Sequence, residues 1–420
     1  MFPRLDGAPT KYKMNANILV LNCGSSSLKY RLMSMPGEKT LASGEAERVG
    51  IKTEQDSALV HTSLGRVQKI SARFDGHPDA FRAVMLLLKK DAASAPEMKI
   101  DAVAHRYVHP GNFFSKTAKL TKKNTALLKK TLDLAPLHNP VSFSLIDICG
   151  NELPRAPQYA VFDTSFHSTM PEKFYTYALP ERLRKKNNIR RFGFHGISHA
   201  YVMQEACRLL DRPPGTQRII SCHLGTGGAS LCAIEYGKSL ANTMGFTPLE
   251  GLMMNTRSGN LDPALVLELM HNKHMPAFDA EKILIKQSGL LGLNGDSSDL
   301  RDIIKKTGSD EKCRLIFEMY VRRIIKYIGY YYLILRKADV LIFTDTIGME
   351  MPVVREKVCE GLEFFGIRLN PGKNNFCTSS ASVVSAEGSP VKVLCIPTNE
   401  ELMIAREAFA CMINGISGTA

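Results

Sequence analysis

The chain has 420 residues, of which 44% are hydrophobic and 23% charged, which is ordinary for a globular protein and enough for two domains with separate cores. Its formal net charge is +13, but the basic clusters are not interleaved with aromatic residues and tryptophan is absent, so we expect no nucleic-acid binding. The excess of positive charge instead fits a protein that attracts anionic substrates.

Signals for membrane insertion, secretion and zinc binding are also missing from the sequence. No run of about 18 uncharged apolar residues occurs, so we expect no membrane association. The ten cysteines are scattered singly, without a C-x-x-C pair or a secretory signal, as is typical of reduced thiols in a cytoplasmic protein without zinc. Residues 1–14 are polar and are interpreted as an N-terminal extension that precedes the fold.

The first predicted element is a hairpin over residues 18–30. An apolar strand, Ile18–Asn22, runs into a turn of small residues, Gly24–Ser27, and a second strand follows. Because glycine and serine are small, the N–H groups of such a turn can converge on an anion. Taken alone, an ordinary hairpin is the simpler interpretation.

The rest of the first half alternates helices and strands after a β-rich stretch that reaches about residue 70. The predicted elements are helices at 79–91 and 121–134 and strands at 100–108 and 158–163. The last strand ends on Asp163, and the carboxyl ends of strands are where the sites of parallel sheets usually form.

About 200 residues after the first hairpin, residues 218–234 repeat the same strand, turn and strand. The elements predicted after it are helices at 262–272, 278–288 and 310–337, strands at 340–344 and 391–396, and a last helix at 400–413. Two copies, each opening one half of the chain, indicate a duplicated phosphate-binding fold. We expect one domain at 15–165, completed by the last helix within 400–420, and a second domain at 166–399.

Polar residues stand beside the first turn and at the start of the last helix. Asn22 ends the first strand and Lys29 lies just beyond the turn, where an exposed strand lysine and a phosphate contact are both reasonable interpretations. Glu400 and Glu401 open the last helix. Acidic residues there normally complement the helix dipole, but a magnesium–phosphate centre also needs carboxylates.

Basic residues recur near strand ends in four short strings. They are His105–His109, Leu137–Asn139, Phe192–His199 and Asn255–Arg257. A lone histidine is more often structural than catalytic, and no metal-ligand spacing such as H-E-x-x-H occurs. Together with the acidic strand end at Asp163, the strings favour phosphoryl transfer, in which cations neutralise the phosphoryl oxygens while in-line geometry is held.

Eight strings, in order along the chain, resemble those of the acetate kinase family. They are Asn22–Lys29, His105–His109, Ala135–Pro140, Val161–His167, Phe192–His199, Met244–Gly251, Ser288–Gly292 and Ile396–Glu401. The resemblance spans residues 17 to about 410. It implies a homodimer and a duplicated α/β fold of the ribonuclease H-like, actin/hexokinase (ASKHA) type. Each of the two domains around a cleft would have the order β-β-β-α-β-α-β-α.

The same resemblance implies reversible, direct in-line phosphoryl transfer between ATP and acetate with Mg²⁺. By this resemblance, Asn22 and Glu400 position the magnesium. Arg106 and Arg257 bind the carboxylate and the migrating phosphoryl group, and His195 stabilises the planar, metaphosphate-like transition state. Acetate is already a nucleophile, so charge neutralisation and alignment are expected to supply most of the rate.

Other residues complete the acyl side that the resemblance implies. Asp163 is the essential acidic residue near the magnesium and the attacking oxygen, and His138 and His223 support phosphate oxygens. A small apolar pocket receives the methyl group of acetate. Its expected residues are Val108, Leu137, Phe194 and Pro248.

The part of the sequence expected to bind the phosphoryl donor departs from the family's pattern at several points. Where the family's second turn reads His-Leu-Gly-Asn-Gly, Thr226 replaces the asparagine and the turn is one residue longer. The family's adenosine loop, Gly-Ile-Gly-Glu-Asn, is here Thr346–Glu350, preceded by Asp345. A β-branched threonine in place of glycine, together with Met349, is expected to narrow the base pocket. The residues expected at the donor are Lys29, His223, Leu224, Gly225, Thr226, Gly227, Asp299, Leu300, Arg301, Thr346, Ile347, Gly348, Met349 and Glu350.

These departures leave the substrates partly open. A minority branch of the family uses pyrophosphate and phosphate in place of ATP and ADP, so either donor is a valid hypothesis. Propionate is the rival acyl substrate, because one methylene changes binding by only about 1–3 kcal/mol. A catalytically silent relative is disfavoured because the charged residues remain, and a sugar kinase because paired arginines stand where a sugar needs neutral groups.

Overall fold

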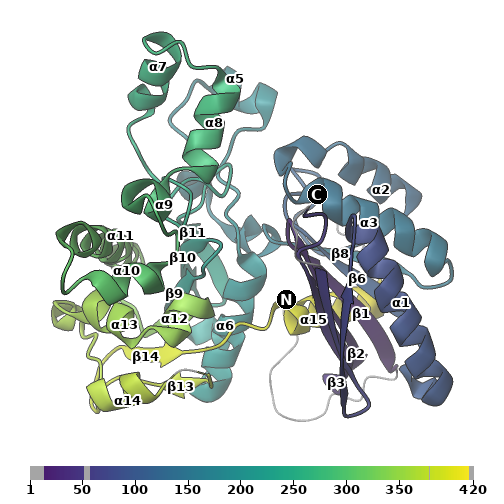
Figure 1. Cartoon of the computed structure of the whole chain (residues 1–420). Coiled ribbons are helices and arrows are strands. Elements are labelled where there is room, and N and C mark those ends of the chain that lie inside the picture. The colour runs from purple at the N-terminus through teal and green to yellow at the C-terminus, as the bar shows by residue number, and fades with distance from the viewer. Residues whose placement is uncertain (1–13, 52–56, 378, 416–420) are drawn as a thin grey trace. The chain divides into compact units, whose positions relative to one another are not determined.

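The computed structural model describes residues 14–51, 57–377 and 379–415, and it divides into two compact units (Figure 1). The first unit consists of the residues up to Ser165 together with those from Asn399 onwards, and the second of Phe166–Thr398. Within the described ranges, no helix combines the length and the hydropathy that crossing a membrane requires.

The first unit is built on an eight-stranded sheet with the order β5-β4-β3-β2-β1-β6-β8-β7. Its strands are β1 (Ala16–Cys23), β2 (Ser27–Met35), β3 (Lys39–Glu47), β4 (Ser57–Ser63), β5 (Arg66–Ala72), β6 (Ala102–Tyr107), β7 (Ala118–Lys119) and β8 (Gln158–Phe162). The strands β1 to β5 form an antiparallel meander, whereas β6 pairs in parallel with both β1 and β8. The β1 run is apolar and almost wholly buried, as expected of a strand at the parallel centre of a sheet.

Helices cover both faces of this sheet (Figure 1). They are α1 (His77–Ser94), α2 (Lys122–Lys129), α3 (Asn139–Glu152) and α15 (Glu400–Asn414), with 3-10 helices η1 (Pro96–Met98) and η2 (Leu132–Leu134). Side chains alternate along a strand, so Leu19 and Leu21 of β1 join the core cluster formed with α1 and α3. The other face of β1 ends with Asn22, which hydrogen-bonds to the first residues of α15.

The prediction of one continuous helix at 121–134 is wrong. The helix α2 ends at Lys129, and a separate 3-10 turn follows at Leu132–Leu134. The Thr131 hydroxyl donates to the Leu128 carbonyl (2.7 Å) and lies 2.9 Å from the Tyr107 hydroxyl. A threonine side chain that bonds to the backbone in this way competes with helix continuation, which explains the break.

The second unit contains a six-stranded sheet with the order β11-β10-β9-β12-β14-β13. Its strands are β9 (Arg218–Leu224), β10 (Ala229–Glu235), β11 (Lys238–Asn242), β12 (Val340–Thr344), β13 (Ser382–Val383) and β14 (Lys392–Cys395). The sub-sheet β11-β10-β9-β12-β14 repeats the order of β3-β2-β1-β6-β8, with the first hairpin antiparallel and the next pairs parallel. The predicted duplication is therefore confirmed.

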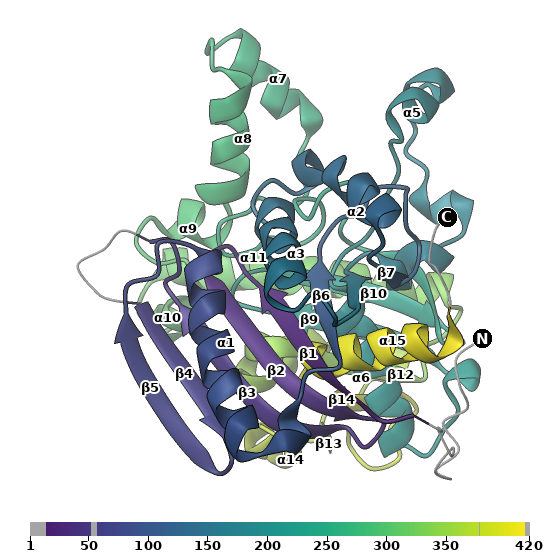
Figure 2. The same ribbon diagram turned by 90° about the vertical axis from the view of Figure 1, so that its right-hand side faces the viewer.

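Helices flank the second sheet as well (Figures 1 and 2), with α6 against β9 and β12 and α11 against β9 and β10. The helices of this unit are α4 (Glu172–Tyr175), α5 (Glu181–Asn187), α6 (Gly196–Leu209), α7 (Pro263–His271), α8 (Ala277–Lys286), α9 (Gly289–Asn294), α10 (Leu300–Lys306), α11 (Glu311–Ile334), α12 (Asp345–Glu350), α13 (Pro352–Cys359) and α14 (Pro371–Phe376). The remaining 3-10 helices are η3 (Ser165–Thr169), η4 (Pro214–Thr216) and η5 (Glu363–Phe365). The segment expected as an adenosine loop forms the helix α12.

A buried polar chain crosses the meander of the first unit. The Tyr30 hydroxyl lies 2.5 Å from His61 Nδ1, and His61 Nε2 lies 2.8 Å from the Asp91 carboxylate. Gly44 of β3 is paired with both Tyr30 and His61. The chain passes over Gly44 because that position has no side chain.

We expect Gly44→Ala to destabilise the protein by about 1–3 kcal/mol, the usual cost of overpacking. A Cβ there would lie 2.2 Å from the Val60 carbonyl oxygen and 2.5 Å from the Tyr30 hydroxyl. Chemical denaturation measures the difference, and Gly37→Ala is the matched control because its nearest neighbour would be 4.0 Å away. Equal stability of the two variants would contradict the packing argument.

Candidate functional site

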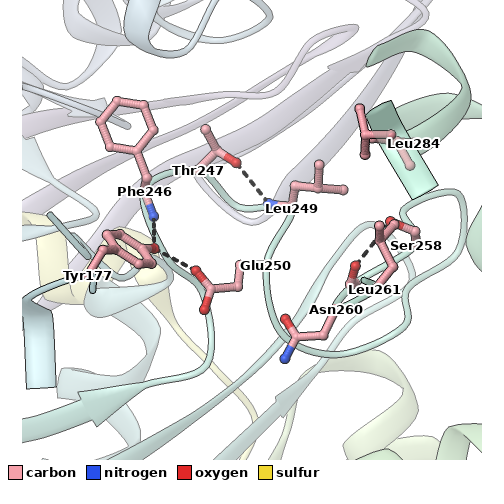
Figure 3. Close-up of a pocket in the computed structure, with 11 residues that line it drawn as sticks. Tyr177, Phe246, Thr247, Leu249, Glu250, Ser258, Asn260, Leu261 and Leu284 are labelled. Carbon is pink, nitrogen blue, oxygen red and sulfur yellow. Dashed lines mark hydrogen bonds between the residues drawn. The ribbon is translucent and has the colours of Figure 1, made fainter. Parts of the chain in front are cut away.

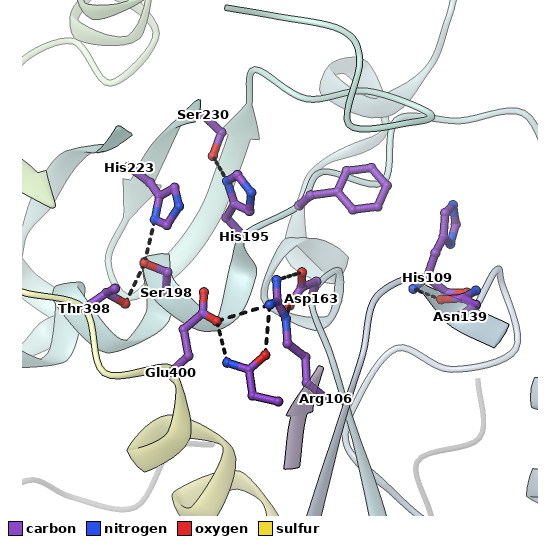
Figure 4. Close-up of polar contacts among 12 residues, drawn as sticks. Arg106, His109, Asn139, Asp163, His195, Ser198, His223, Ser230, Thr398 and Glu400 are labelled. Carbon is purple, nitrogen blue, oxygen red and sulfur yellow. Dashed lines mark hydrogen bonds and ion pairs between the residues drawn. The ribbon is translucent and has the colours of Figure 1, made fainter. Parts of the chain in front are cut away.

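In the first unit, the carboxyl ends of parallel strands bring three predicted site residues together. Arg106 of β6 makes a bidentate contact with the Asp163 carboxylate, donating from Nε (2.9 Å) and from a terminal nitrogen (2.7 Å). Its other terminal nitrogen donates to Asn22 Oδ1 (3.0 Å) and lies 3.4 Å from Glu400 (Figure 4). The Asn22 amide in turn donates to Glu400 (3.2 Å) and Glu401 (2.9 Å).

The charge of this cluster is unbalanced toward negative. Burial by itself lowers the pKa of Arg106, but the charges of Asp163 and Glu400 outweigh it and raise that pKa above its ordinary value. One cation and these two carboxylates give a formal charge of −1, while Glu401 has its own partner in Arg31 (3.8 Å). The cluster therefore favours a further cation beside it.

The oxygen donors of this cluster fit the magnesium expected from the sequence. Mg²⁺ prefers carboxylate and carbonyl oxygens and is usually held by one or two carboxylates together with substrate phosphates. Asn22 Oδ1 and the carboxylates of Asp163 and Glu400 are donors of that kind. Among the described residues, no group of three or more His, Cys, Asp or Glu side chains is arranged as a complete metal site.

The other predicted residues of the first unit differ in burial and in local contacts. Val108, directly after β6, is buried, whereas Leu137 is 43% exposed. His138 precedes α3, and its neighbour Asn139 donates to the His109 carbonyl (2.9 Å) and accepts from the His109 N–H (3.2 Å). This reciprocal pair fixes the loop that carries Val108. Lys29 is exposed and lies 3.6 Å from Glu45.

The two small-residue turns close in the same way. In the first, the Gly24 N–H donates to the Ser27 carbonyl (3.0 Å), and in the second the Gly225 N–H donates to the Gly228 carbonyl (3.0 Å). In each, two residues stand between the bonded pair. The duplication thus extends to the turn geometry, with Thr226 and Gly227 at the tip of the second turn.

His195 in the second unit is oriented by a chain of buried hydrogen bonds. Its Nδ1 lies 2.9 Å from the Ser230 hydroxyl (Figure 4). The same hydroxyl lies 2.9 Å from His199 Nε2. His199 Nδ1 is 2.9 Å from Ser221. Burial, followed by the nearby histidines, holds the pKa of His199 well below its usual value. His199 is therefore a neutral link that fixes Ser230 and, through it, the His195 ring.

His223 is held at both ring nitrogens. Nδ1 lies 2.9 Å from the Ser198 hydroxyl, which accepts a hydrogen bond from Thr398 (2.9 Å). Nε2 lies 3.0 Å from the Asp345 carboxylate. Burial would raise the pKa of Asp345, but His223 and the hydrogen bonds from Thr346 hold it well below its usual value. The sequence marked Asp345 only as the residue before the donor segment, and the structure brings it into contact with a predicted site residue.

Arg257 lies near His195 within the same unit. A Cβ built on Gly228 would be 3.4 Å from His195 Nε2 and 3.5 Å from an Arg257 terminal nitrogen. That nitrogen donates to the Pro248 carbonyl (3.2 Å), and burial lowers the pKa of Arg257. Phe194, next to His195, is fully buried. The second unit therefore gathers His195, Arg257 and Pro248 around the glycine turn.

A cavity of about 240 Å³ lies beside the loop that carries Pro248 (Figure 3). Its lining includes Thr247, Leu249 and Glu250, and Glu250 accepts a hydrogen bond from Tyr177 (2.5 Å). Phe194 and Pro248, which the sequence assigns to the acyl pocket, do not belong to this lining. We therefore do not equate the cavity with the expected methyl pocket.

The remaining residues expected to bind the phosphoryl donor lie on two short helices or at the start of one. Asp299 caps α10 by accepting from the Arg301 N–H (2.9 Å), and the Arg301 side chain folds back onto it (2.7 Å) and toward Glu350 (3.4 Å). Leu300 is buried within the unit. On α12, Ile347, Gly348 and Met349 are buried, while Thr346 is half-buried and Glu350 exposed.

Residues 17–406 match the model of the acetokinase family. The chain belongs to the acetokinase family. It is 45% identical over 394 residues to the acetate kinase of Alkaliphilus metalliredigens, covering 93% of this chain and 98% of that relative. The crystal structure of Porphyromonas gingivalis acetate kinase matches with a TM-score of 0.86 and 40% identity over 94% of this chain and 100% of that one. The crystal structure of a propionate kinase from Francisella tularensis matches with a TM-score of 0.85 and 35% identity, covering 93% of this chain and 98% of that one.

Family membership confirms the fold and the resemblance that the sequence motifs predicted. Within each unit, the structure brings residues from distant motifs into contact. They are Asn22, Arg106, Asp163 and Glu400 in the first unit, and His195, His223 and Arg257 around one turn in the second. The contacts of Ser230 with His195, of Ser198 with His223 and of Asp345 with His223 were not predicted. The spacing of these three residues in the sequence does not distinguish them from other serines and carboxylates.

We expect Arg106→Ala to lower kcat by about 100-fold or more and to raise the KM for the carboxylate, since its charge would act in the ground and transition states. The rate at which acyl phosphate forms, measured by trapping it as the hydroxamate, gives both kcat and the KM for the carboxylate. Arg106→Lys is expected to recover part of the activity at most, because lysine lacks the planar guanidinium group that forms two hydrogen bonds with Asp163.

Folding is checked separately for these arginine variants, because removing Arg106 leaves Asp163 and Glu400 without their shared cation. Arg82→Ala, which removes an exposed ion pair with Asp79 on α1, is the matched control and should be fully active. Near-normal kinetics of a folded Arg106→Ala protein would remove Arg106 from the site.

For His195→Gln we expect kcat to fall by about 100-fold with little change in KM, the pattern of a group that acts mainly in the transition state. Steady-state kinetics of the hydroxamate assay separate the two constants. His271→Gln, at the exposed end of α7, is the control. A rise in KM without a fall in kcat would assign His195 to ground-state binding instead.

Proposed function

We propose that this protein acts as an acetate kinase. It would transfer a phosphoryl group reversibly and directly between acetate and a phosphoryl donor. The observation that carries the proposal is the joined cluster of Arg106, Asp163, Asn22 and Glu400, since these residues come from motifs far apart in the sequence. Family membership and a 45% identical relative named acetate kinase support it.

The proposed roles in the first unit concern acetate and the metal. Asn22 and Glu400 would hold Mg²⁺, which when bound supplies positive charge to the phosphate oxygens. Arg106 would bind the carboxylate and keep Asp163 and Glu400 oriented. Val108 belongs to the proposed methyl pocket, and its loop is held by the His109–Asn139 pair. Leu137 and His138 would complete this acyl side.

The proposed roles in the second unit concern the phosphoryl group. The chain through Ser230 would hold His195 so that its Nε2 faces the oxygens of the planar transition state. Arg257 supplies a fixed positive charge that does not titrate near neutral pH. No strong general base is needed, because the acetate carboxylate is ionised near neutral pH and attacks directly. Alignment and charge neutralisation therefore account for the rate.

Acetate is proposed over propionate as the acyl substrate, although the margin is small in physical terms. One methylene is worth about 1–3 kcal/mol in an apolar pocket, so propionate is expected to react with a higher KM. The Francisella relative named propionate kinase is of similar structural closeness. Parallel assays with both acids decide the preference.

The donor is proposed to be ATP, with pyrophosphate as the second candidate. Thr346 and Met349 favour the second candidate, because they differ from the glycine-rich adenosine loop of the family. We also propose a cytoplasmic homodimer that binds Mg²⁺, in keeping with the family resemblance.

The deciding assay measures acetyl phosphate formation from acetate and magnesium as the hydroxamate, with ATP, GTP and pyrophosphate in parallel. The reverse direction uses acetyl phosphate with ADP or with inorganic phosphate. We expect activity with one donor class. Activity only with ATP and ADP would retire the pyrophosphate candidate, activity only with pyrophosphate and phosphate would retire ATP, and no acetyl phosphate with any donor would refute the proposed function.

A further inference from the structure

The carboxylate of Asp345 lies directly on the second glycine turn. Its Oδ2 is 2.3 Å from the point where a Cβ on Gly225 would be, so it occupies the space that any side chain at position 225 would need. The Asp345 backbone has a φ of 64°, a conformation that aspartate tolerates better than most residues. Thr346 fixes the carboxylate further, through its N–H (2.7 Å) and its hydroxyl (3.1 Å).

This carboxylate shares a face of the hairpin with the proposed transfer residues. Gly225 is bonded to Gly228 across the turn, and directly opposed residues of an antiparallel pair point to the same side. A Cβ on Gly228 would meet His195 and Arg257, whereas a Cβ on Gly225 would meet Asp345. Both sets of groups thus surround one small turn of the second unit.

Asp345 also engages the ring nitrogen that a phosphate would need. His223 Nδ1 lies 2.9 Å from the Ser198 hydroxyl, and Nε2, the other ring nitrogen, lies 3.0 Å from the Asp345 carboxylate. A carboxylate and a phosphate oxygen are both anionic acceptors that compete for the same donor. Asp345 therefore holds the position of an anion on His223.

We propose that Asp345 is a donor-specificity residue that acts as an internal competitor, occupying the place of a donor phosphate oxygen on His223 and the Gly225 turn. A polyphosphate donor has to displace this carboxylate, or bear its repulsion, in order to reach the turn. The inference rests on the proposed phosphoryl transfer. It adds that one residue of this chain weakens the binding of the donor's phosphate.

Titration calorimetry of pyrophosphate without magnesium tests the proposal on the full chain. Removing one like charge at close range should tighten pyrophosphate binding to Asp345→Asn by about five-fold or more. Asparagine suits the positive φ and keeps an acceptor for Thr346, and Asp345→Gly, which also suits that φ, should show the same gain. Glu356→Gln removes an equal charge from an exposed position on α13 and should leave the affinity unchanged.

Unchanged or weaker pyrophosphate binding by both folded Asp345 variants would overturn the proposal, as would an equal gain in Glu356→Gln. Thermal melting confirms that each variant is folded. The hydroxamate assay separates this outcome from failure of the proposed function. If the wild-type chain makes acetyl phosphate and the variants show no lower KM for the donor, only the role of Asp345 fails. A gain in affinity in a chain that makes no acetyl phosphate would refute the function alone.

Discussion

Parallel pairing of neighbouring strands is the constraint on which the candidate site residues of each unit depend. In the first unit, β6 pairs in parallel with β1 and β8. The carboxyl ends of the three strands therefore meet at one edge of the sheet, where they deliver Asn22, Arg106 and Asp163. In the second unit, β12 pairs in parallel with β9 and places Thr344 opposite His223. In this way Arg106 and Asn22, which are 84 positions apart, meet at the ends of neighbouring apolar strands.

Polar groups gathered in this way are costly to bury, and the structure offsets that cost by pairing them. Arg106 shares its donors among Asp163, Asn22 and Glu400, so that little of its hydrogen-bonding capacity is unused. The buried histidines of the second unit are linked through serine hydroxyls instead. The first arrangement leaves a formal net negative charge, whereas the second fixes the orientation of the histidine rings.

Backbone strain accompanies the candidate site residues of the second unit. His195 and Asp345 have φ values of 57° and 64°, a region that non-glycine residues rarely adopt. Both stand where a segment turns sharply into a helix, α6 for His195 and α12 for Asp345. The sharp turn aims each side chain back at the hairpin, so the conformational cost is linked to the orientation of polar groups around Gly225 and Gly228.

The sequence by itself determined the duplicated fold, the family and most of the charged residues of the candidate site. Apolar strands followed by small-residue turns recur at Ile18 and Ile219, and such local patterns survive in the amino-acid order. Helix continuity at 121–134 was predicted wrongly, because the contact of the Thr131 hydroxyl with Tyr107, on a separate strand, depends on how the chain packs. Only the tertiary structure decided that Asp345 meets His223. The two residues are 122 positions apart, and the pairing of β12 with β9 brings their segments together.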